Sequence, residues 1–477
     1  MTVEIDTRPL WLIIALRALR PIFFAALLVL FIALLYMPAP AGLSPEGQKA
    51  IAIFAVCFIL WISNALPLAI TSLFAIVLVP LFGVLSKRET YALFGNEAVF
   101  FILGAFILAG AVMHSGLSTR VALTIMDRFG ASPKRLILSI FLLAAALSFL
   151  MSEHAVAAML FPIVFEISKG LNLKPGASNY GKLLFFSLAW GCVIGGVATF
   201  LGGARVPLAI GILKETTGKT IEFSDYIIAV FPIVIALLFA GYFIMTYFFP
   251  IDVTDIDKAH NVLGKRIKTL GKITYMEYAV GVVMLVTILA WVFLGKRFGL
   301  AGIALSSVVA LFVLRLVRWK DIEEYVNWGI ILMYGGAIIL GAALDKSGAA
   351  SWLVNSIMGG WSDSPVVVFA LLSLLTIALT EAMSNAAVIV ILLPVSIGLA
   401  DKLSIDPAAM TYAIAVPAGL AFMFPMSTPA NAIAVSSNYI SVRDMAKGGF
   451  IMCVLSWLVF NLAAAFYWPL IGMGYLK

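Results

Sequence analysis

Long apolar segments separated by short polar stretches follow one another along almost the whole chain. A helix needs about 20 apolar residues to cross the hydrocarbon core of a bilayer. Segments that meet or approach this length lie at 21–38, 48–66, 68–85, 98–115, 183–212, 226–249, 275–295, 299–317, 328–345, 408–437 and 447–473. The pattern predicts an all-α polytopic membrane protein with about eleven transmembrane helices.

The charged residues agree with this interpretation. They make up 12% of the chain, against roughly a quarter in a soluble domain. The net charge of +7 comes from Lys and Arg in the polar gaps, as in cytoplasmic loops, so no nucleic-acid partner is expected. Segment 21–38 follows Arg17 and Arg20 and lacks a convincing cleavage site, which indicates a first membrane helix. We expect a multi-pass protein of the cell (inner) membrane, surrounded by the lipid bilayer, with a cytoplasmic N-terminus.

Two further apolar stretches, 135–168 and 366–400, are each interrupted midway by a polar cluster, at 152–154 and at 384–385. Each half is then about 15 residues, or about 22 Å as a helix, which is too short to cross comfortably. A chain break at membrane depth survives where it is buried in protein or lines a cavity. Both stretches therefore predict re-entrant helical hairpins with polar tips.

The two halves of the chain repeat each other at an offset of 232 residues. The matched pairs are Ser115 with Ser347, Gly116 with Gly348, Ser152 with Ser384, and Pro162 with Pro394. The predicted organisation is an N-terminal helix and first scaffold helices at 1–95, a first repeat at 96–249 with hairpin 135–168 and broken helix 183–212, a polar linker at 250–274, and a second repeat at 275–477 with hairpin 366–400 and broken helix 408–437.

Charge around the two hairpins predicts that they face opposite sides of the membrane. Lys402 is the one basic residue flanking the second hairpin, beside two aspartates. The first is flanked by Arg128, Lys134, Arg135, Lys169, Lys174 and Lys182. The positive-inside rule then puts the mouth of the first hairpin in the cytosol. Two repeats of opposite topology are typical of secondary transporters.

The second hairpin tip offers groups for both an anion and a cation. Ser384 stands at the N-cap position of the following helix, whose free N–H groups and dipole favour an anion. The preceding helix ends near Thr380, and its free carbonyls suit a small cation such as Na⁺. In the same half, Pro425 and Pro429 interrupt an apolar helix, although a simple proline kink is the alternative interpretation.

At these residues the chain resembles the divalent anion/sodium symporter family, whose members carry di- and tricarboxylates or sulfate. The similarity rests on Ser384-Asn385-Ala386 and on the run 427–433, which reads Ser-Thr-Pro-Ala-Asn-Ala-Ile. It implies eleven membrane-crossing helices, a homodimer and an elevator-type movement of the hairpin-bearing domain. It also implies substrate contacts from Ser384, Asn385, Ala386, Thr428 and Pro429, and a Na⁺ site formed by Thr380, Ser384, Asn385 and Ser427.

The chain departs from the family pattern, most strongly in the first half. Ala386 replaces a threonine at the second tip. At the first tip Ser152 is kept, but Glu153 stands where the family has asparagine and His154 where it has threonine. In the first broken helix Arg205 stands in place of threonine.

Charges at membrane depth are costly and usually paired or functional. Our hypothesis is that Arg205 occupies the region of the first Na⁺ site, with Glu153 as its partner. The expected substrate-binding residues of this half are Ser152, Glu153, His154 and Arg205.

These features together predict a secondary active transporter of small organic dianions resembling C4-dicarboxylates. Coupling is either Na⁺ symport with reduced stoichiometry or substrate exchange, and the expected cofactor list is empty apart from Na⁺ at the second-repeat site. Proton coupling through Glu153 or His154, transport of another oxyanion such as sulfate, and an ion channel stay open as alternatives. The sequence contains neither HExxH nor Gly-x-Ser-x-Gly, and no enzymatic activity is expected.

Overall fold

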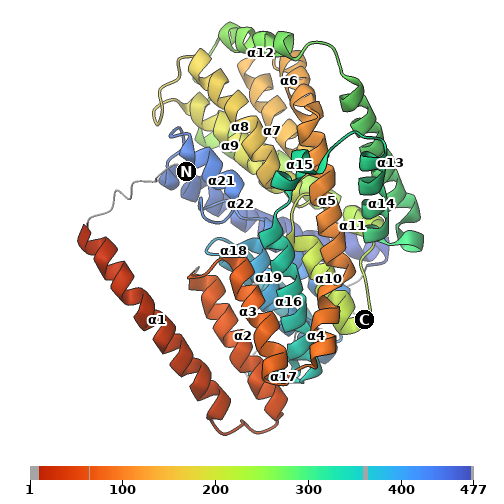
Figure 1. The fold of residues 1–477 in the computed structure, drawn as a ribbon. Coiled ribbons are helices and arrows are strands. Elements are labelled where there is room, and N and C mark those ends of the chain that lie inside the picture. Colours follow the sequence, from red (N-terminus) through yellow and green to blue (C-terminus); the bar gives the residue numbers. More distant parts are fainter. Residues whose placement is uncertain (1–9, 64, 358–363, 474–477) are drawn as a thin grey trace.

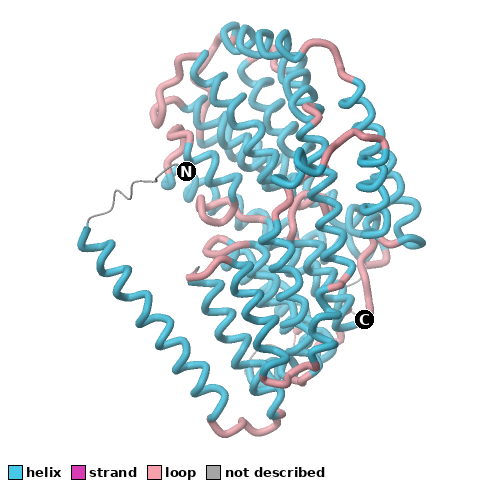
Figure 2. Tube along the Cα trace, viewed as in Figure 1, coloured by secondary structure: helices cyan, strands magenta, loops and turns pink. Residues whose placement is uncertain are grey.

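The protein is a bundle of helices (Figure 1), described by a computed structural model over residues 10–63, 65–357 and 364–473. Within these ranges every regular element is a helix. Loops are found at the two ends of the bundle and also at mid-height (Figure 2). The expected all-α class is therefore confirmed, and the mid-height loops identify the places where helices are interrupted inside the molecule.

The first half, up to residue 270, contains twelve α-helices in the described ranges. They are α1 (Leu10–Tyr36), α2 (Pro45–Ser63), α3 (Leu68–Leu81), α4 (Lys87–Phe94), α5 (Glu97–His114), α6 (Leu117–Phe129), α7 (Pro133–Ser148), α8 (Glu153–Gly170), α9 (Asn179–Gly196), α10 (Arg205–Thr217), α11 (Phe223–Phe248) and α12 (Asp257–Leu270).

The second half mirrors this order with similar elements. They are α13 (Tyr275–Phe298), α14 (Leu300–Val313), α15 (Trp319–Ile322), η1 (Glu323–Tyr325), α16 (Trp328–Lys346), α17 (Ala349–Ile357), α18 (Pro365–Thr380), α19 (Asn385–Lys402), α20 (Pro407–Ala415), η3 (Pro417–Gly419), α21 (Pro429–Ser436), α22 (Val442–Leu462), η4 (Ala463–Tyr467) and η5 (Trp468–Ile471).

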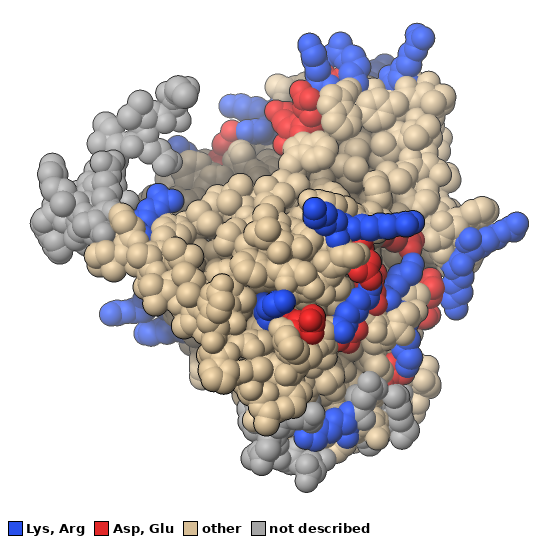
Figure 3. Space-filling view, turned by 60° about the horizontal axis from the view of Figure 1, so that its bottom comes forward, with Lys and Arg blue, Asp and Glu red and all other residues tan. Residues whose placement is uncertain are grey.

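The outer surface is apolar to a degree that fits lipid rather than water. Seven helical segments of the described chain are long and apolar enough to cross a membrane, and α3, α14, α18 and most of α19 are shorter apolar helices. Large apolar side chains such as Phe239, Phe243 and Phe293 are at least 70% exposed. Figure 3 shows broad areas without Lys, Arg, Asp or Glu. Exposed apolar surface on this scale indicates a membrane protein, so the multi-pass prediction is confirmed.

Two helical hairpins enter the bundle from opposite ends. The pair α7–α8 lies in the upper part of Figure 1, next to α12, while α18 and α19 lie in the lower part, where α17 marks the bottom of the molecule. Each hairpin turns within a few residues, at 149–152 and at 381–384. The expected hairpins and their opposite directions are both present, as the two inverted repeats predicted.

Two broken helices lie against the hairpins. The helix expected at 183–212 is divided into α9 and α10 by an irregular segment at 197–204. The helix expected at 408–437 is divided into α20 and α21 by a longer segment that includes η3. In the second break Pro429 is the first residue of α21, where its missing N–H and fixed φ fit a helix start. The simple proline kink is therefore wrong for this segment.

The helices outside the hairpins preserve the repeat in their packing. Gly104 of α5 faces Ala304 of α14, where an added Cβ would lie 2.7 Å from the Ala304 Cβ. Gly336 of α16 faces Ser72 of α3, where an added Cβ would lie 2.5 Å from the Ser72 Cβ. At the 232-residue offset, Gly104 corresponds to Gly336 and Ser72 corresponds to Ala304. The same contact is therefore made twice, once from each half. Small residues at these crossings allow close backbone approach, as in membrane bundles generally.

The segment 250–274 is more structured than a polar linker. It contains α12, which packs against α6 and α8 through its apolar side. Arg266 of α12 forms an ion pair with Glu166 of α8, with 2.8 Å between Nε and Oε2. The charged residues that suggested a linker therefore belong to the exposed side of an amphipathic helix lying across the first hairpin.

Candidate functional site

The tip of the first hairpin is tied to the first helix break by local hydrogen bonds. Ser152 caps α8, with its side chain accepting from the Ala155 N–H at 3.4 Å. The backbone N–H of Glu153 donates to the Gly202 carbonyl at 3.0 Å. On the other side of the tip, the Thr199 hydroxyl donates to a hairpin carbonyl, that of Phe149, at 2.6 Å. Tip and break therefore form one connected unit.

A buried charge pair lies between this tip and the start of α10. Arg205 Nη1 is 3.5 Å from Glu153 Oε2, and the two side chains are 2% and 1% exposed. Arg205 is the first residue of α10, and the N-cap residue Ala204 provides no side-chain cap. A cation at a helix N-terminus opposes the helix dipole. The carboxylate of Glu153 therefore offsets both the charge and its unfavourable position.

The Arg205 guanidinium also reaches the break of the second broken helix. A Cβ added at Gly419 would collide with Arg205 Nε, and one added at Gly203 would collide with Arg205 Nη1. The guanidinium is thus enclosed between glycines of both breaks. Its Nε and Nη2 have no hydrogen-bond partner among the described residues, and neither does Glu153 Oε2. The pair lies at the junction of the two repeats rather than within the first repeat alone.

The second hairpin tip is built from neutral oxygens. Thr380 Oγ1 lies 2.7 Å from Asn385 Oδ1 and 2.8 Å from the carbonyl oxygen of Ala418 in η3. One hydroxyl proton can satisfy one of the two acceptors at a time. Ser384 caps α19, accepting from the Ala387 N–H at 3.3 Å. These three oxygens share a single proton and lie at the end of a half-helix, beside unwound backbone. Such a group of oxygens has the composition of a small-cation site.

The second break is held in shape by Asn431, a residue that the sequence reasoning did not assign to the site. Its Nδ2 donates to the carbonyl of Ala421 at 3.1 Å and lies 3.2 Å from the Ser427 hydroxyl. Ser427 in turn donates to the Phe424 carbonyl at 2.6 Å. Thr428 caps α21, accepting from the Asn431 N–H at 3.2 Å. Ser427 and Thr428 therefore lie within a polar network that fixes the break.

Glu381 lies one turn before the second tip and connects it to the second break. It is 5% exposed, and its carboxylate accepts hydrogen bonds from three successive backbone N–H groups, those of Phe422, Met423 and Phe424, at 2.6, 2.9 and 3.1 Å. The Cys453 thiol lies 3.1 Å from the same carboxylate. Glu381 thus joins the second hairpin tip to the second break, much as Thr199 joins the first pair.

A cavity of about 510 Å³ opens beside the first tip. Ser152 and His154 line it on one side, and Tyr325, Asn327 and Trp328 line it on the other. Among the described residues, no other predicted site residue lines this cavity. The Glu153–Arg205 pair is buried rather than exposed to the cavity, and the residues of the second tip lie elsewhere. His154 is exposed, so it faces this cavity while its neighbour Glu153 turns inward.

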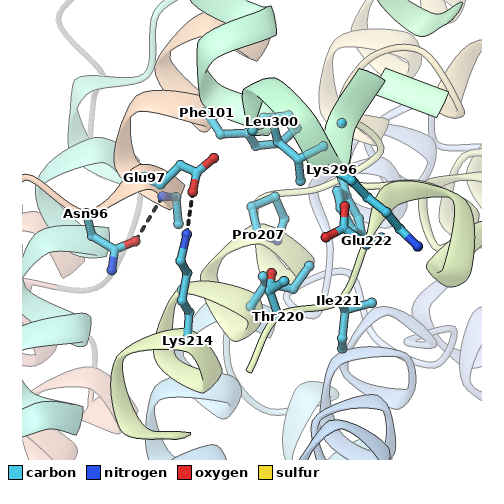
Figure 4. Close-up of a pocket in the computed structure, with 16 residues that line it drawn as sticks. Asn96, Glu97, Phe101, Pro207, Lys214, Thr220, Ile221, Glu222, Lys296 and Leu300 are labelled. Atoms are coloured by element: carbon cyan, nitrogen blue, oxygen red, sulfur yellow. Dashed lines mark hydrogen bonds and ion pairs between the residues drawn. The ribbon is translucent and has the colours of Figure 1, made fainter. Parts of the chain in front are cut away.

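A second, smaller cavity of about 230 Å³ lies beside α10, away from both tips (Figure 4). It contains Lys214 near the end of α10, paired with Glu97 of α5 at 2.6 Å. Glu222 and Lys296 also line it. None of the predicted site residues lines this cavity, so its charges form a contact between α10 and the neighbouring helices.

The fold combines inverted repeats with two interrupted helices, and polar groups of two hairpin tips lie at mid-height. This combination is typical of a membrane transporter rather than an enzyme. The chain belongs to the sodium:sulfate symporter family, since the family model "Sodium:sulfate symporter transmembrane region" matches residues 21–474. The resemblance seen in the tip and break motifs is thereby confirmed.

Relatives of known annotation cover nearly the whole chain. A protein of Staphylococcus saprophyticus subsp. saprophyticus, described as "Sodium-dependent dicarboxylate transporter SdcS", is 30% identical and matches 94% of this chain and 90% of its own. A protein of the same description from Staphylococcus aureus strain bovine RF122 is 28% identical, with coverage of 93% and 90%.

Two solved transporters share the fold. The MtrF protein of Neisseria gonorrhoeae matches with a TM-score of 0.57 at 14% identity, covering 94% of this chain and 93% of its own. The YdaH transporter of Alcanivorax borkumensis matches with a TM-score of 0.52 at 14% identity, covering 81% and 91%. At this identity the likeness concerns the architecture alone.

Proposed function

We propose that this protein is a secondary active transporter of small organic dianions such as C4-dicarboxylates, working by Na⁺ symport with reduced stoichiometry or by substrate exchange. The observation that carries the proposal is the contrast between the two tips. One holds the buried Glu153–Arg205 pair at 3.5 Å, and the other holds a cluster of neutral oxygens around Thr380. The names of the relatives, sodium-dependent dicarboxylate transporters, support the substrate class.

The substrate is held between the two hairpin tips. Ser152 and Ser384 each cap a helix that starts at a tip, and free N–H groups at such helix starts attract carboxylates. His154 adds a donor in the cavity beside the first tip. Asn385 and Ala386 face the substrate from the second tip, with Thr428 and Pro429 at the neighbouring helix start. Because Ala386 has no hydroxyl, binding on this side relies on Asn385 and on backbone N–H groups.

Arg205 serves as a fixed cation in the first repeat. Its side chain is 2% exposed, so its charge acts on the bound dianion through the protein rather than through a direct contact in this conformation. Because Glu153 lies 3.5 Å away with the opposite charge, the pair presents a dipole rather than a net positive charge. The guanidinium takes the place of one coupling ion. Glu153 holds the guanidinium in place between the breaks.

The second repeat holds the remaining Na⁺. Its ligands are Thr380 Oγ1, Asn385 Oδ1 and the Ala418 carbonyl, with Ser384 and Ser427 close to this cluster along the chain. Neutral oxygens from side chains and unwound backbone are the ligands that transporters use for Na⁺. This arrangement supports symport of a single ion, while the exchange mode requires that substrate alone drives the conformational cycle.

The arrangement in the membrane follows from charge and from the family. The mouth of the first hairpin, with its flanking Lys and Arg residues, faces the cytosol of the cell (inner) membrane, which also places the N-terminus there. The domain bearing the hairpins moves as an elevator against the helices around α5, α14, α3 and α16, and two copies of the chain form a homodimer.

Uptake of labelled succinate into proteoliposomes tests the proposal. Three conditions are compared: an inward Na⁺ gradient, an inward proton gradient, and internal unlabelled succinate with neither gradient. Stimulation by Na⁺ supports symport, and stimulation by internal succinate alone supports exchange. Arg205→Thr and Glu153→Asn variants are expected to alter transport and its Na⁺ response. Unchanged behaviour of both variants removes the pair from the mechanism.

Two alternatives are separated in the same experiment. The family model is described as a sodium:sulfate symporter region, so labelled sulfate forms a parallel arm, and uptake of sulfate without succinate replaces the dicarboxylate assignment. His154 is exposed in the cavity beside the first tip, and stimulation by the proton gradient alone supports proton coupling. Saturation and counterflow exclude an ion channel.

A further inference from the structure

The carboxylate of Glu381 has an unusual set of partners for a buried acid. Two oxygens receive four donors: the N–H groups of Phe422 and Met423 and the Cys453 thiol at Oε1, and the N–H of Phe424 at Oε2. A protonated carboxyl would need an acceptor for its own hydrogen, whereas an ionised carboxylate only accepts. The geometry therefore fits the charged form, because each of these contacts brings a donor to the carboxylate.

This charge has no basic partner in the described part of the chain. The charged residues buried there are Glu153, Arg205, Glu277 and Glu381. Glu153 pairs with Arg205, and Glu277 pairs with Arg120 at 2.7 Å. No ion pair is found for Glu381 among the described residues, where its charge is balanced by backbone dipoles and a thiol. These donors satisfy the hydrogen bonding of the carboxylate but bring no full positive charge, and a cation bound nearby would be attracted by the charge that remains.

The place of that cation is given by the neighbouring oxygens. Glu381 directly follows Thr380, whose hydroxyl converges with Asn385 Oδ1 and the Ala418 carbonyl. The three N–H groups bound by Glu381 lie a few residues after Ala418 in the same break. By holding these N–H groups, Glu381 fixes the unwound backbone that also presents the Ala418 carbonyl to the Thr380 hydroxyl.

We infer that Glu381 is the positioning residue and counter-charge for one monovalent cation bound at Thr380, Asn385 and the Ala418 carbonyl. The inference rests on the proposed function and adds to it the number of Na⁺ ions bound. In the hairpin and break region, the buried charges of Glu153, Glu381 and Arg205 sum to one net negative charge. A single bound Na⁺ neutralises the region before the dianion arrives, and the ion is held without touching the carboxylate itself.

Two measurements on the purified full-length protein test this inference. The first is the thermal stabilisation that Na⁺ produces when it replaces choline, because an ion that binds the folded state raises its stability. The second is the Na⁺ concentration that half-activates succinate uptake in proteoliposomes. For Glu381→Gln we expect the Na⁺-dependent stabilisation to be lost and the half-activating concentration to rise by about tenfold or more. The succinate KM at saturating Na⁺ is expected to change by less than about threefold, since substrate contacts are intact.

Further variants separate the two roles of Glu381. Glu381→Asp keeps the charge but shortens the side chain, and we expect a smaller loss of Na⁺ affinity than with Gln. Cys453→Ala removes only the thiol contact and keeps the three N–H contacts, and we expect a weakening of Na⁺ binding of about two- to threefold. These two variants carry the test if Glu381→Gln does not fold. Glu89→Gln is the matched control, because Glu89 caps α4 at the surface.

The outcomes distinguish this inference from the proposed function. Na⁺ curves equal to wild type in Glu381→Gln, or in both Glu381→Asp and Cys453→Ala, overturn the inference. A wild-type protein that transports succinate but shows neither Na⁺ stabilisation nor Na⁺ activation also overturns it, while leaving exchange in place. A wild-type protein that is stabilised by Na⁺ through Glu381 but takes up no succinate supports the inference and overturns the dicarboxylate assignment.

Discussion

The two hairpin tips of this transporter share a backbone plan but differ in chemistry. Each begins its second helix with a serine cap, Ser152 or Ser384, and each is tied to the adjacent helix break. The first then places a glutamate against an arginine, whereas the second gathers neutral oxygens around Thr380. The comparison teaches that an inverted repeat preserves geometry while its two halves diverge in charge. In the mechanism that we propose, the first site carries its cation permanently and the second has to bind it.

Outside the tips the two halves have stayed more alike. The crossing of Gly104 with Ala304 and that of Gly336 with Ser72 are the same contact made twice, with the partners exchanged. Close helix approach leaves little freedom for substitution at these positions. The contrast in charge at the tips is therefore accompanied by a shared packing contact in the helices that surround them.

Removing one member of the buried pair should have the largest effect. Arg205→Ala leaves the buried carboxyl group of Glu153 without its partner, and it is expected to lower the free energy of unfolding by about 3–5 kcal/mol. The double variant Arg205→Thr with Glu153→Asn replaces both charges of the pair with neutral side chains, and it should lose less than the Arg205→Ala variant. Thermal unfolding in detergent measures both. Equal or greater loss in the double variant would contradict the pairing.

The two scaffold crossings predict an unequal response to the same change. At Gly336 an added methyl group meets the backbone of α3, with Ser72 Cα and its carbonyl oxygen both at 2.7 Å. At Gly104 it meets mainly the Ala304 side chain. Gly336→Ala is expected to destabilise the protein by about 1–3 kcal/mol, and Gly104→Ala by less, as for other overpacked sites. Equal thermal unfolding midpoints for the two variants would contradict this prediction. They would show that the backbone of α3 shifts to accept the added methyl group as easily as the Ala304 side chain does.

The threonines that tie each tip to its break should separate ion binding from structure. Thr380→Val removes an oxygen from the proposed cation cluster, and we expect the half-activating Na⁺ concentration for succinate uptake to rise about tenfold. Thr199→Val removes the corresponding link in the first repeat, from its hydroxyl to the Phe149 carbonyl, and should leave Na⁺ activation unchanged. A similar Na⁺ shift in both variants would mean that the two tips are not specialised.

Restoring one hydroxyl at the second tip should have the smallest effect. Ala386→Thr supplies the group that the family motif has at this position, and one additional hydrogen bond is worth about 0.5–1.5 kcal/mol. The KM for succinate is expected to fall by about two- to tenfold. Ala386→Val, which adds similar bulk without a hydroxyl, is the control. A fall in KM with valine as well would assign the effect to shape.

Much of this architecture could be predicted from the sequence because it is periodic. Polar interruptions at 152–154 and 384–385 indicate both hairpins, and the 232-residue offset matches Ser152 with the predicted cap Ser384. Segment 250–274 reads as a linker in the sequence because charged residues dominate its composition. The signal for α12 was present in the apolar positions Ala259 and Leu263, four residues apart and both buried.

The contacts that complete the site could not be predicted, for a physical reason. Glu381 binds N–H groups about 40 residues away in the chain, and those groups are free only because the helix is broken there. Asn431 donates to the Ala421 carbonyl, ten residues earlier in the same break. Neither contact follows a helical spacing, so each required the folded arrangement of the break. The Glu153–Arg205 pair could be predicted from the sequence, because a charged residue in an apolar segment usually needs a partner.

The count of Na⁺ ions moved with each substrate tests the central claim most directly. Radiolabelled Na⁺ and succinate uptake are measured together in proteoliposomes, in wild type and in the Arg205→Thr/Glu153→Asn double variant. A fixed cation in the first repeat and one bound ion in the second predict about one Na⁺ per succinate in wild type, with a Hill coefficient for Na⁺ of about 1. Two or more Na⁺ per succinate in wild type would contradict the account, whereas succinate uptake with no movement of Na⁺ would remove the bound ion of the second repeat and leave only the exchange mode.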